Sequence, residues 1–140
     1  MSNSFEARVL IIEALNRYAL GYDQGDFELL RQAFSSDAVS GGRVVGTYIS
    51  WGPMVGREQI VQGLREMRLG QSIQPRHCIG NVLFSSIQAD RASLTCYLQL
   101  VAAAQGSAAL ATVGVLEVNA KVEDGNWYIS HLDVNLDAPF

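Results

Sequence analysis

The apolar residues of this chain change their spacing near Pro75, and this change constrains the fold more than any other feature. Before it they recur at helical intervals: Ile11, Leu15, Tyr18 and Tyr22 follow one another at steps of four, three and four. After it they alternate with a period of two, which is typical of strands. Helices first and strands afterwards predict an α+β fold with an antiparallel sheet.

Start and stop signals divide the first part of the chain into three helices. The first should end before Gly25, because glycine accepts the backbone conformation that follows a helix. Asp26 can cap a second helix with its side chain, and a third helix is expected from Gly56 to Gly70. Between the second and third helices, residues 39–51 carry β-branched pairs broken by glycines, which predicts a short hairpin.

The second part of the chain reads as four strands joined by turns. Strands are expected after Pro75 and near residues 91–104, 107–122 and 126–136. The Asp124-Gly125 pair favours a tight hairpin turn, because glycine accepts a positive φ. Strict alternation in the first of these strands predicts one face that holds His77, Ile79, Asn81, Leu83 and Ile87.

No charged residue occurs between Ser93 and Leu116, and this stretch is long enough to cross a membrane. Its centre reads Gln105-Gly106-Ser107, so two uncharged strands around a turn explain it better than a membrane span. A sheet with one face in water would alternate apolar and charged residues. We therefore expect both faces to be dry, one against the helices and one against another copy in a homo-oligomer, a dimer or trimer. The alternative is a small face of Ser, Thr and Gln left in water.

Size and charge narrow the classes of protein to which the chain can belong. Its 140 residues suit one domain, spanning residues 1–140, and are too few for two good cores. Ten basic residues are scattered among fourteen acidic ones, for a net charge of −4. Phosphate binding needs clustered Lys and Arg, so no nucleic-acid partner is expected. The first residues show no basic segment followed by an apolar run, which predicts a cytoplasmic protein without a signal peptide.

The cysteines and histidines do not form a metal-binding pattern. Cys78 and Cys96 are too few for a disulfide framework, and neither C-x-x-C nor H-x-x-x-H spacing is present. Cys78 directly follows His77, but neighbours on a strand point to opposite faces, which argues against a Cys–His nucleophile. We expect no metal and no cofactor.

Several stretches resemble the SnoaL-like domains of the NTF2-like superfamily. Residues 16–30 read NRYALGYDQGDFELL, and Phe34-Ser35-Ser36-Asp37-Ala38 follows. Such domains commonly open with a Tyr-bearing helix, an Asp-x-x-Asp turn, a short helix and Phe-x-x-Asp-Ala. The spacing His77-x-x-x-Asn81 and the run Asp124-Gly125-Asn126-Trp127 extend the likeness over nearly the whole chain. The resemblance implies an NTF2-like cone, in which three N-terminal helices pack on a curved, mainly antiparallel sheet around a pocket for a small apolar or aromatic ligand.

Two enzymes of this superfamily make the expectation more specific. Scytalone dehydratase and hexachlorocyclohexane dehydrochlorinase place a catalytic Asp at the end of the first helix and a His on the first long strand, and Asp23 and His77 match these positions. The resemblance implies that His77 removes a proton from the substrate while Asp23 orients the imidazole. Such a base typically contributes about 10²–10⁴-fold to the rate. Leu98 stands where we match the second pocket histidine of scytalone dehydratase, so the substrate stays open.

Five further residues are candidates for lining the substrate pocket. They are Tyr18, Tyr22, Tyr48, Trp51 and Asn81. The first two lie four residues apart on one helix face, where aromatic rings with a hydroxyl edge suit both a core and a pocket. Tyr48 and Trp51 are expected on loops at the pocket mouth. Asn81 shares the predicted strand face of His77 and could bond a substrate.

Three functions fit this pattern. The leading hypothesis is a cofactor-independent lyase that eliminates water or a halide from a small apolar molecule. A non-catalytic module that binds a small ligand or takes part in assembly would keep Asp23 and His77 as a buried polar pair. An enzyme similar to polyketide cyclases or isomerases would use the same pocket.

Overall fold

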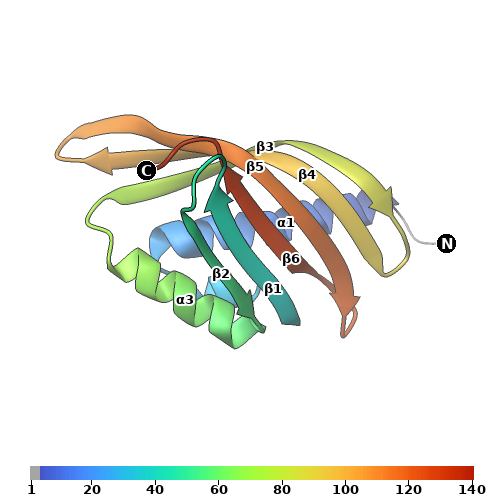
Figure 1. Cartoon of the computed structure of the whole chain (residues 1–140). Coiled ribbons are helices and arrows are strands. Elements are labelled where there is room, and N and C mark those ends of the chain that lie inside the picture. The colour runs from blue at the N-terminus through green and yellow to red at the C-terminus, as the bar shows by residue number, and fades with distance from the viewer. Residues whose placement is uncertain (1–3) are drawn as a thin grey trace.

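The computed structural model describes residues 4–140, which form three helices packed beneath a curved six-stranded sheet (Figure 1). The helices are α1 (Ser4–Gln24), α2 (Phe27–Arg31) and α3 (Arg57–Leu69). The strands are β1 (Phe34–Val44), β2 (Ser50–Val55), β3 (Gln74–Ile87), β4 (Arg91–Ala104), β5 (Ser107–Glu123) and β6 (Asn126–Leu136). The α+β class predicted from the change of apolar spacing is confirmed.

The sheet is mixed and has the strand order β2-β1-β6-β5-β4-β3. Strands β3 to β6 form an antiparallel meander, and β1 and β2 form the hairpin predicted near residues 39–51, although β1 begins earlier, at Phe34. β1 lies parallel to β6, with Ser40 opposite Leu132. The prediction of an antiparallel sheet is therefore wrong at this pair. Turns set the direction of strands that are consecutive in the chain, and no turn joins β1 to β6.

Local signals fix several element boundaries as the sequence predicted. α1 ends at Gln24, and Gly25 follows with a φ of 68°. Asp26 caps α2 by accepting a hydrogen bond from the main-chain N–H of Leu29 at 3.1 Å. The Asp124-Gly125 turn has φ values of 50° and 81°, as a tight hairpin between twisted strands requires.

The hydrophobic core lies between α1 and the concave face of the sheet. On the helix, the predicted stripe buries Ile11 and Leu15 completely, and Leu116 of β5 belongs to the same cluster. Each such buried side chain stabilises the fold by about 1.5–3 kcal/mol. The stripe continues to Tyr18 and Tyr22 in the last turns of α1. These two rings therefore lie at the end of the core that is next to the C-terminal end of α1.

A bulge in β3 changes which residues face the helices. Asn81 has a φ of 53°, and the pairing of β3 with β4 shifts between Gly80 and Leu83. An extra residue in a strand reverses the alternation beyond it. Val82 and Phe84 consequently pack against the core, whereas Asn81 and Leu83 are exposed. The predicted shared face of His77, Asn81 and Leu83 is wrong for this reason.

The uncharged stretch from Ser93 to Leu116 forms most of β4 and the first half of β5, as predicted. One face of these strands is buried, whereas Tyr97 and Gln99 are exposed on the other. A homo-oligomer that covers this outer face stays a prediction. Within residues 4–140, none of the helices has the length and apolar character needed to cross a bilayer.

A close approach of α1 and α2 yields a stability prediction. A Cβ at Gly21 would lie 2.6 Å from the main-chain nitrogen of Leu30. Gly21→Ala should therefore lower the free energy of unfolding by about 1–3 kcal/mol, although alanine usually stabilises a helix interior. Gly63→Ala in α3 is the matched control, because a Cβ there meets only the flexible side chain of Met54. Urea unfolding of both variants measures the difference, and equal stabilities would contradict the predicted clash.

Candidate active site

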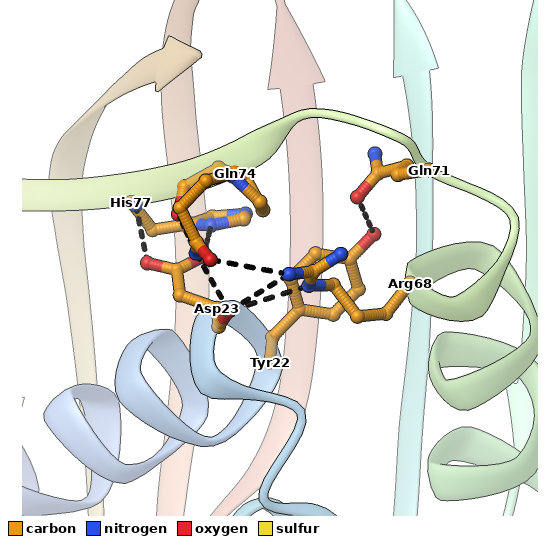
Figure 2. Close-up of polar contacts among 7 residues, drawn as sticks. Tyr22, Asp23, Arg68, Gln71, Gln74 and His77 are labelled. Carbon is orange, nitrogen blue, oxygen red and sulfur yellow. Dashed lines mark hydrogen bonds and ion pairs between the residues drawn. The ribbon is translucent and has the colours of Figure 1, made fainter. Parts of the chain in front are cut away.

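Asp23 and His77, which are 54 residues apart in sequence, are joined by two hydrogen bonds (Figure 2). Asp23 lies near the end of α1, and its Oδ1 is 2.6 Å from the ring Nδ1 of His77. Its Oδ2 accepts a hydrogen bond from the main-chain N–H of His77 at 2.7 Å. An ionised carboxylate only accepts, so in the neutral imidazole this contact favours the tautomer with the hydrogen on Nδ1 and a lone pair on Nε2.

The pair is withdrawn from water. The side chains of Asp23 and His77 are 4% and 10% exposed. Ion pairs and hydrogen bonds at exposed positions are weakened by water and salt, whereas a buried carboxylate–imidazole contact keeps most of its electrostatic strength. This arrangement fixes the orientation of the imidazole as well as its tautomer.

Two tyrosine rings of α1 pack edge-on against the imidazole. The centroids of Tyr18 and Tyr22 lie 5.7 and 5.2 Å from that of His77, at interplanar angles of 73° and 71°. The hydroxyl of Tyr22 donates to Oε1 of Gln71 at 3.0 Å. Burial raises the pKa of Tyr22 to about 12, although the nearby charge of Arg68 opposes this shift, and burial also raises the pKa of Tyr18. Both phenols are therefore neutral at physiological pH.

The carbonyl oxygen of Asp23 has its own set of donors (Figure 2). Arg68 of α3 approaches it with Nε at 3.3 Å and Nη2 at 3.2 Å, and Nε2 of Gln74 donates to it at 2.8 Å. Three elements, namely α1, α3 and the start of β3, thus meet at this residue.

An open cavity of about 330 Å³ lies beside the imidazole and is mostly apolar. Its aliphatic wall comes from β4 and β6, with Leu98, Leu100, Leu132, Val134 and Leu136. Trp51 of β2, Met67 of α3 and Phe140 contribute further apolar surface. The polar lining residues are Tyr18, Tyr22, Ser40, Gln71 and His77. No Lys, Arg, Asp or Glu lines the cavity in the part of the chain that the structure describes.

The structure brings together most of the residues that the sequence singled out. Tyr18, Tyr22, Trp51 and His77 line the cavity, and Asp23 lies against His77. Two predicted lining residues lie elsewhere, Tyr48 and Asn81. Tyr48 is 99% exposed, because it stands in the turn between β1 and β2 rather than at the cavity. Asn81 is directed to the outer face of the sheet by the bulge in β3, where it lines a separate groove.

Sequence reasoning missed several residues of the cavity. Met67 follows Ile60 and Leu64 at helical spacing in the third helix, so that pattern could have suggested it. Gln71 lies between α3 and β3, where no periodicity marks a residue. Ser40 uses its hydroxyl to bond the carbonyl oxygen of Leu132 at 2.9 Å. Among residues 4–140, no group of three or more His, Cys, Asp and Glu side chains is arranged to hold a metal ion.

Solved structures share this fold at low sequence identity. A protein with a cystatin-like fold from Nostoc punctiforme is 24% identical and superimposes with a TM-score of 0.79, over 93% of this chain and 90% of that protein. The β subunit of a candidate aromatic-ring-hydroxylating dioxygenase from Novosphingobium aromaticivorans is 15% identical, with a TM-score of 0.79 over 98% and 93% of the two chains. A candidate scytalone dehydratase from the same organism is 13% identical, with a TM-score of 0.75 over 95% and 85%.

The family assignment rests on the sequence itself. No curated protein sequence gives a significant match to the chain. The profile of the SnoaL-like domain, however, matches residues 3–133, which is nearly the whole length. The fold agrees with it, since the similar solved structures include proteins described as cystatin-like and NTF2-like. The resemblance noted in the opening segment is thereby confirmed, and the chain belongs to the SnoaL-like domain family.

Proposed function

We propose that this protein is a cofactor-independent lyase that eliminates water or a halide from a small, uncharged, mostly apolar molecule. The observation that supports this most directly is the 2.6 Å contact between Asp23 and His77 beside an apolar cavity. An oriented imidazole and an apolar cavity beside it are the features that removal of a proton from carbon requires near neutral pH.

In this proposal His77 is the general base. Asp23 accepts the hydrogen on Nδ1, which leaves Nε2 to act on a bound molecule. The imidazolium that forms when Nε2 takes a proton is stabilised by the carboxylate beside it. That attraction is stronger in a buried site than in water, so the pair favours the charged state that develops during the reaction.

The elimination balances without a further reactant. Nε2 takes a proton from carbon, and the electrons of that C–H bond form the new C=C bond. The bond from the neighbouring carbon to the leaving group breaks, and the leaving group keeps its electron pair. A halide departs as the anion, after which the imidazolium of His77 releases its proton to solvent. A hydroxyl departs as water when the imidazolium returns the proton to it.

The cavity lining favours an uncharged substrate. No described lining residue carries a permanent positive charge, and the carboxylate of Asp23 lies behind the imidazole. A carboxylate or phosphate on the ligand would lose its hydration without gaining a cation, at a cost of several kcal/mol. The volume of about 330 Å³ is near the lower end of the range for small-molecule sites. It suits a compound of one or two rings.

Two other functions remain compatible with the same residues. The fold shared with a dioxygenase β subunit suits a non-catalytic binding or assembly module, in which Asp23 and His77 form only a structural contact. An isomerase would begin with the same proton removal and return the proton to a different carbon. Product analysis separates an isomerase from a lyase, because only the lyase releases water or a halide.

Replacement of His77 tests the proposed base. The purified protein is screened against small cyclic ketones, phenols and halogenated rings. With a substrate from this screen, His77→Ala should lower kcat by about 10²–10⁴-fold and leave ligand binding largely intact. His131→Ala is the control, because His131 is exposed on β6 and lies outside the cavity. Comparable turnover in His77→Ala and the wild type would defeat the mechanism, and binding without conversion by the wild type would favour the binding module.

Alkaline titration tests the buried state of the phenol beside His77. Burial raises the pKa of Tyr22 from 10.0 to about 12, so the folded chain keeps this phenol protonated where the unfolded chain ionises it. The associated stability is fully present below pH 10.0 and is lost as the pH rises through about 12. In an ultraviolet titration, Tyr22→Phe should reduce the phenolate signal that the folded wild type gains at the highest pH. A titration curve identical to that of the wild type would refute this assignment.

A further inference from the structure

The end of α1 needs external hydrogen-bond donors. The last carbonyl groups of a helix have no partner within it. Here the carbonyl oxygens of Gly21 and Tyr22 accept hydrogen bonds from Asp26 at 2.9 Å and Gly25 at 3.1 Å, through main-chain N–H groups. The carbonyl oxygen of Asp23 instead accepts from side chains that belong to other elements. The residue whose carboxylate orients His77 is therefore held from outside its own helix.

Arg68 supplies the positive charge that the end of α1 lacks. The last turn of α1 contains no basic residue, although a cation there complements the helix dipole. Arg68 stands in the last turn of α3 and directs both Nε and Nη2 to the carbonyl oxygen of Asp23. It contacts the main chain of Asp23 and does not line the cavity. Its contacts are therefore suited to positioning rather than to binding a substrate.

Gln74 links the same carbonyl group to the strand that carries His77. Its Nε2 donates to the carbonyl oxygens of Asp23 at 2.8 Å and of Pro75 at 2.9 Å. Its Oε1 lies 3.5 Å from Nη2 of Arg68. Gln74 is the first residue of β3, three residues before His77. One amide side chain thus ties the end of α1 to the start of β3.

The hydrogen bonds between Asp23 and His77 depend on how the end of α1 is held relative to β3. Both carboxylate oxygens of Asp23 bond His77, one at the ring and one at the main chain, so α1 and β3 must keep a fixed separation. A misplacement of about 1 Å in a catalytic group can cost about 10²-fold in rate. We propose that Arg68 and Gln74 are positioning residues that hold Asp23 in register with His77 by binding its carbonyl oxygen, an inference that rests on the proposed function.

The first test needs no substrate. In the wild type, the Nδ1 hydrogen of His77 should give a downfield proton resonance that exchanges slowly with water, because Asp23 accepts it in a buried site. Arg68→Met and Gln74→Met each leave the other donor on the carbonyl oxygen, so both variants are expected to fold. In each variant, the Nδ1 hydrogen of His77 should exchange at least about tenfold faster, or its resonance should disappear. Thermal unfolding checks that the variant is folded. Arg68→Lys, which keeps a cationic donor, should restore it in part.

The control is Arg65→Met on the same helix. The guanidinium of Arg65 stacks on the ring of Phe27 at 5.1 Å and takes no part in the contacts of Asp23. This variant should keep the wild-type resonance. An unchanged resonance and exchange rate in both Arg68→Met and Gln74→Met would overturn the positioning role.

Kinetics then separates this inference from the proposed function. With a substrate from the screen, Arg68→Met and Gln74→Met should lower kcat by about 10–100-fold and leave KM within about twofold, because they disturb the base rather than the cavity. If the two variants lose the resonance but the wild type shows no turnover, the lyase proposal is defeated and the positioning of Asp23 stands. Full kcat in both variants would refute the positioning role while the lyase proposal stands.

Discussion

The site depends on one physical contact, the two hydrogen bonds between the carboxylate of Asp23 and His77. One oxygen lies 2.6 Å from Nδ1, and the other accepts the main-chain N–H of the same residue at 2.7 Å. Two bonds to one residue fix an angle as well as a distance. Burial strengthens both, because water does not compete for the carboxylate. The end of α1 and the start of β3 are thereby joined beside the cavity that His77 lines.

The charged groups of the site lie outside the cavity lining, although the carboxylate of Asp23 contacts the imidazole. Arg68 binds the carbonyl oxygen of Asp23, and the carboxylate lies behind the ring of His77. The cavity wall from β4 and β6 is aliphatic, and the hydroxyls of the two tyrosines whose rings pack against the imidazole stay neutral. A base in such surroundings acts on a neutral molecule more readily than on an anion, because no lining cation replaces the hydration that an anion loses.

The sequence predicted the parts of the site that local spacing and family resemblance determine. The helical stripe ends at Tyr22, directly before Asp23, and the resemblance to SnoaL-like domains paired Asp23 with His77. Prediction failed at Asn81, where a single positive φ reversed the alternation of β3, and at Tyr48, which the β1–β2 turn holds in water. Gln71 was missed because it acts from a connection between elements. Bulges, turn directions and side-chain contacts between distant segments leave no periodic signal in a chain, so spacing alone does not reveal them.

The tautomer of His77 is the most direct readout of its contact with Asp23. The ring nitrogens of His77 are observed by ¹⁵N NMR near neutral pH, in the wild type and in Asp23→Asn. We expect the wild type to carry its hydrogen on Nδ1 and to leave Nε2 unprotonated, because the carboxylate of Asp23 only accepts. In Asp23→Asn the amide can donate to Nδ1, and the hydrogen should move to Nε2 in a large share of the molecules. The same tautomer in both proteins, or a hydrogen on Nε2 in the wild type, would show that Asp23 does not set the tautomer of His77.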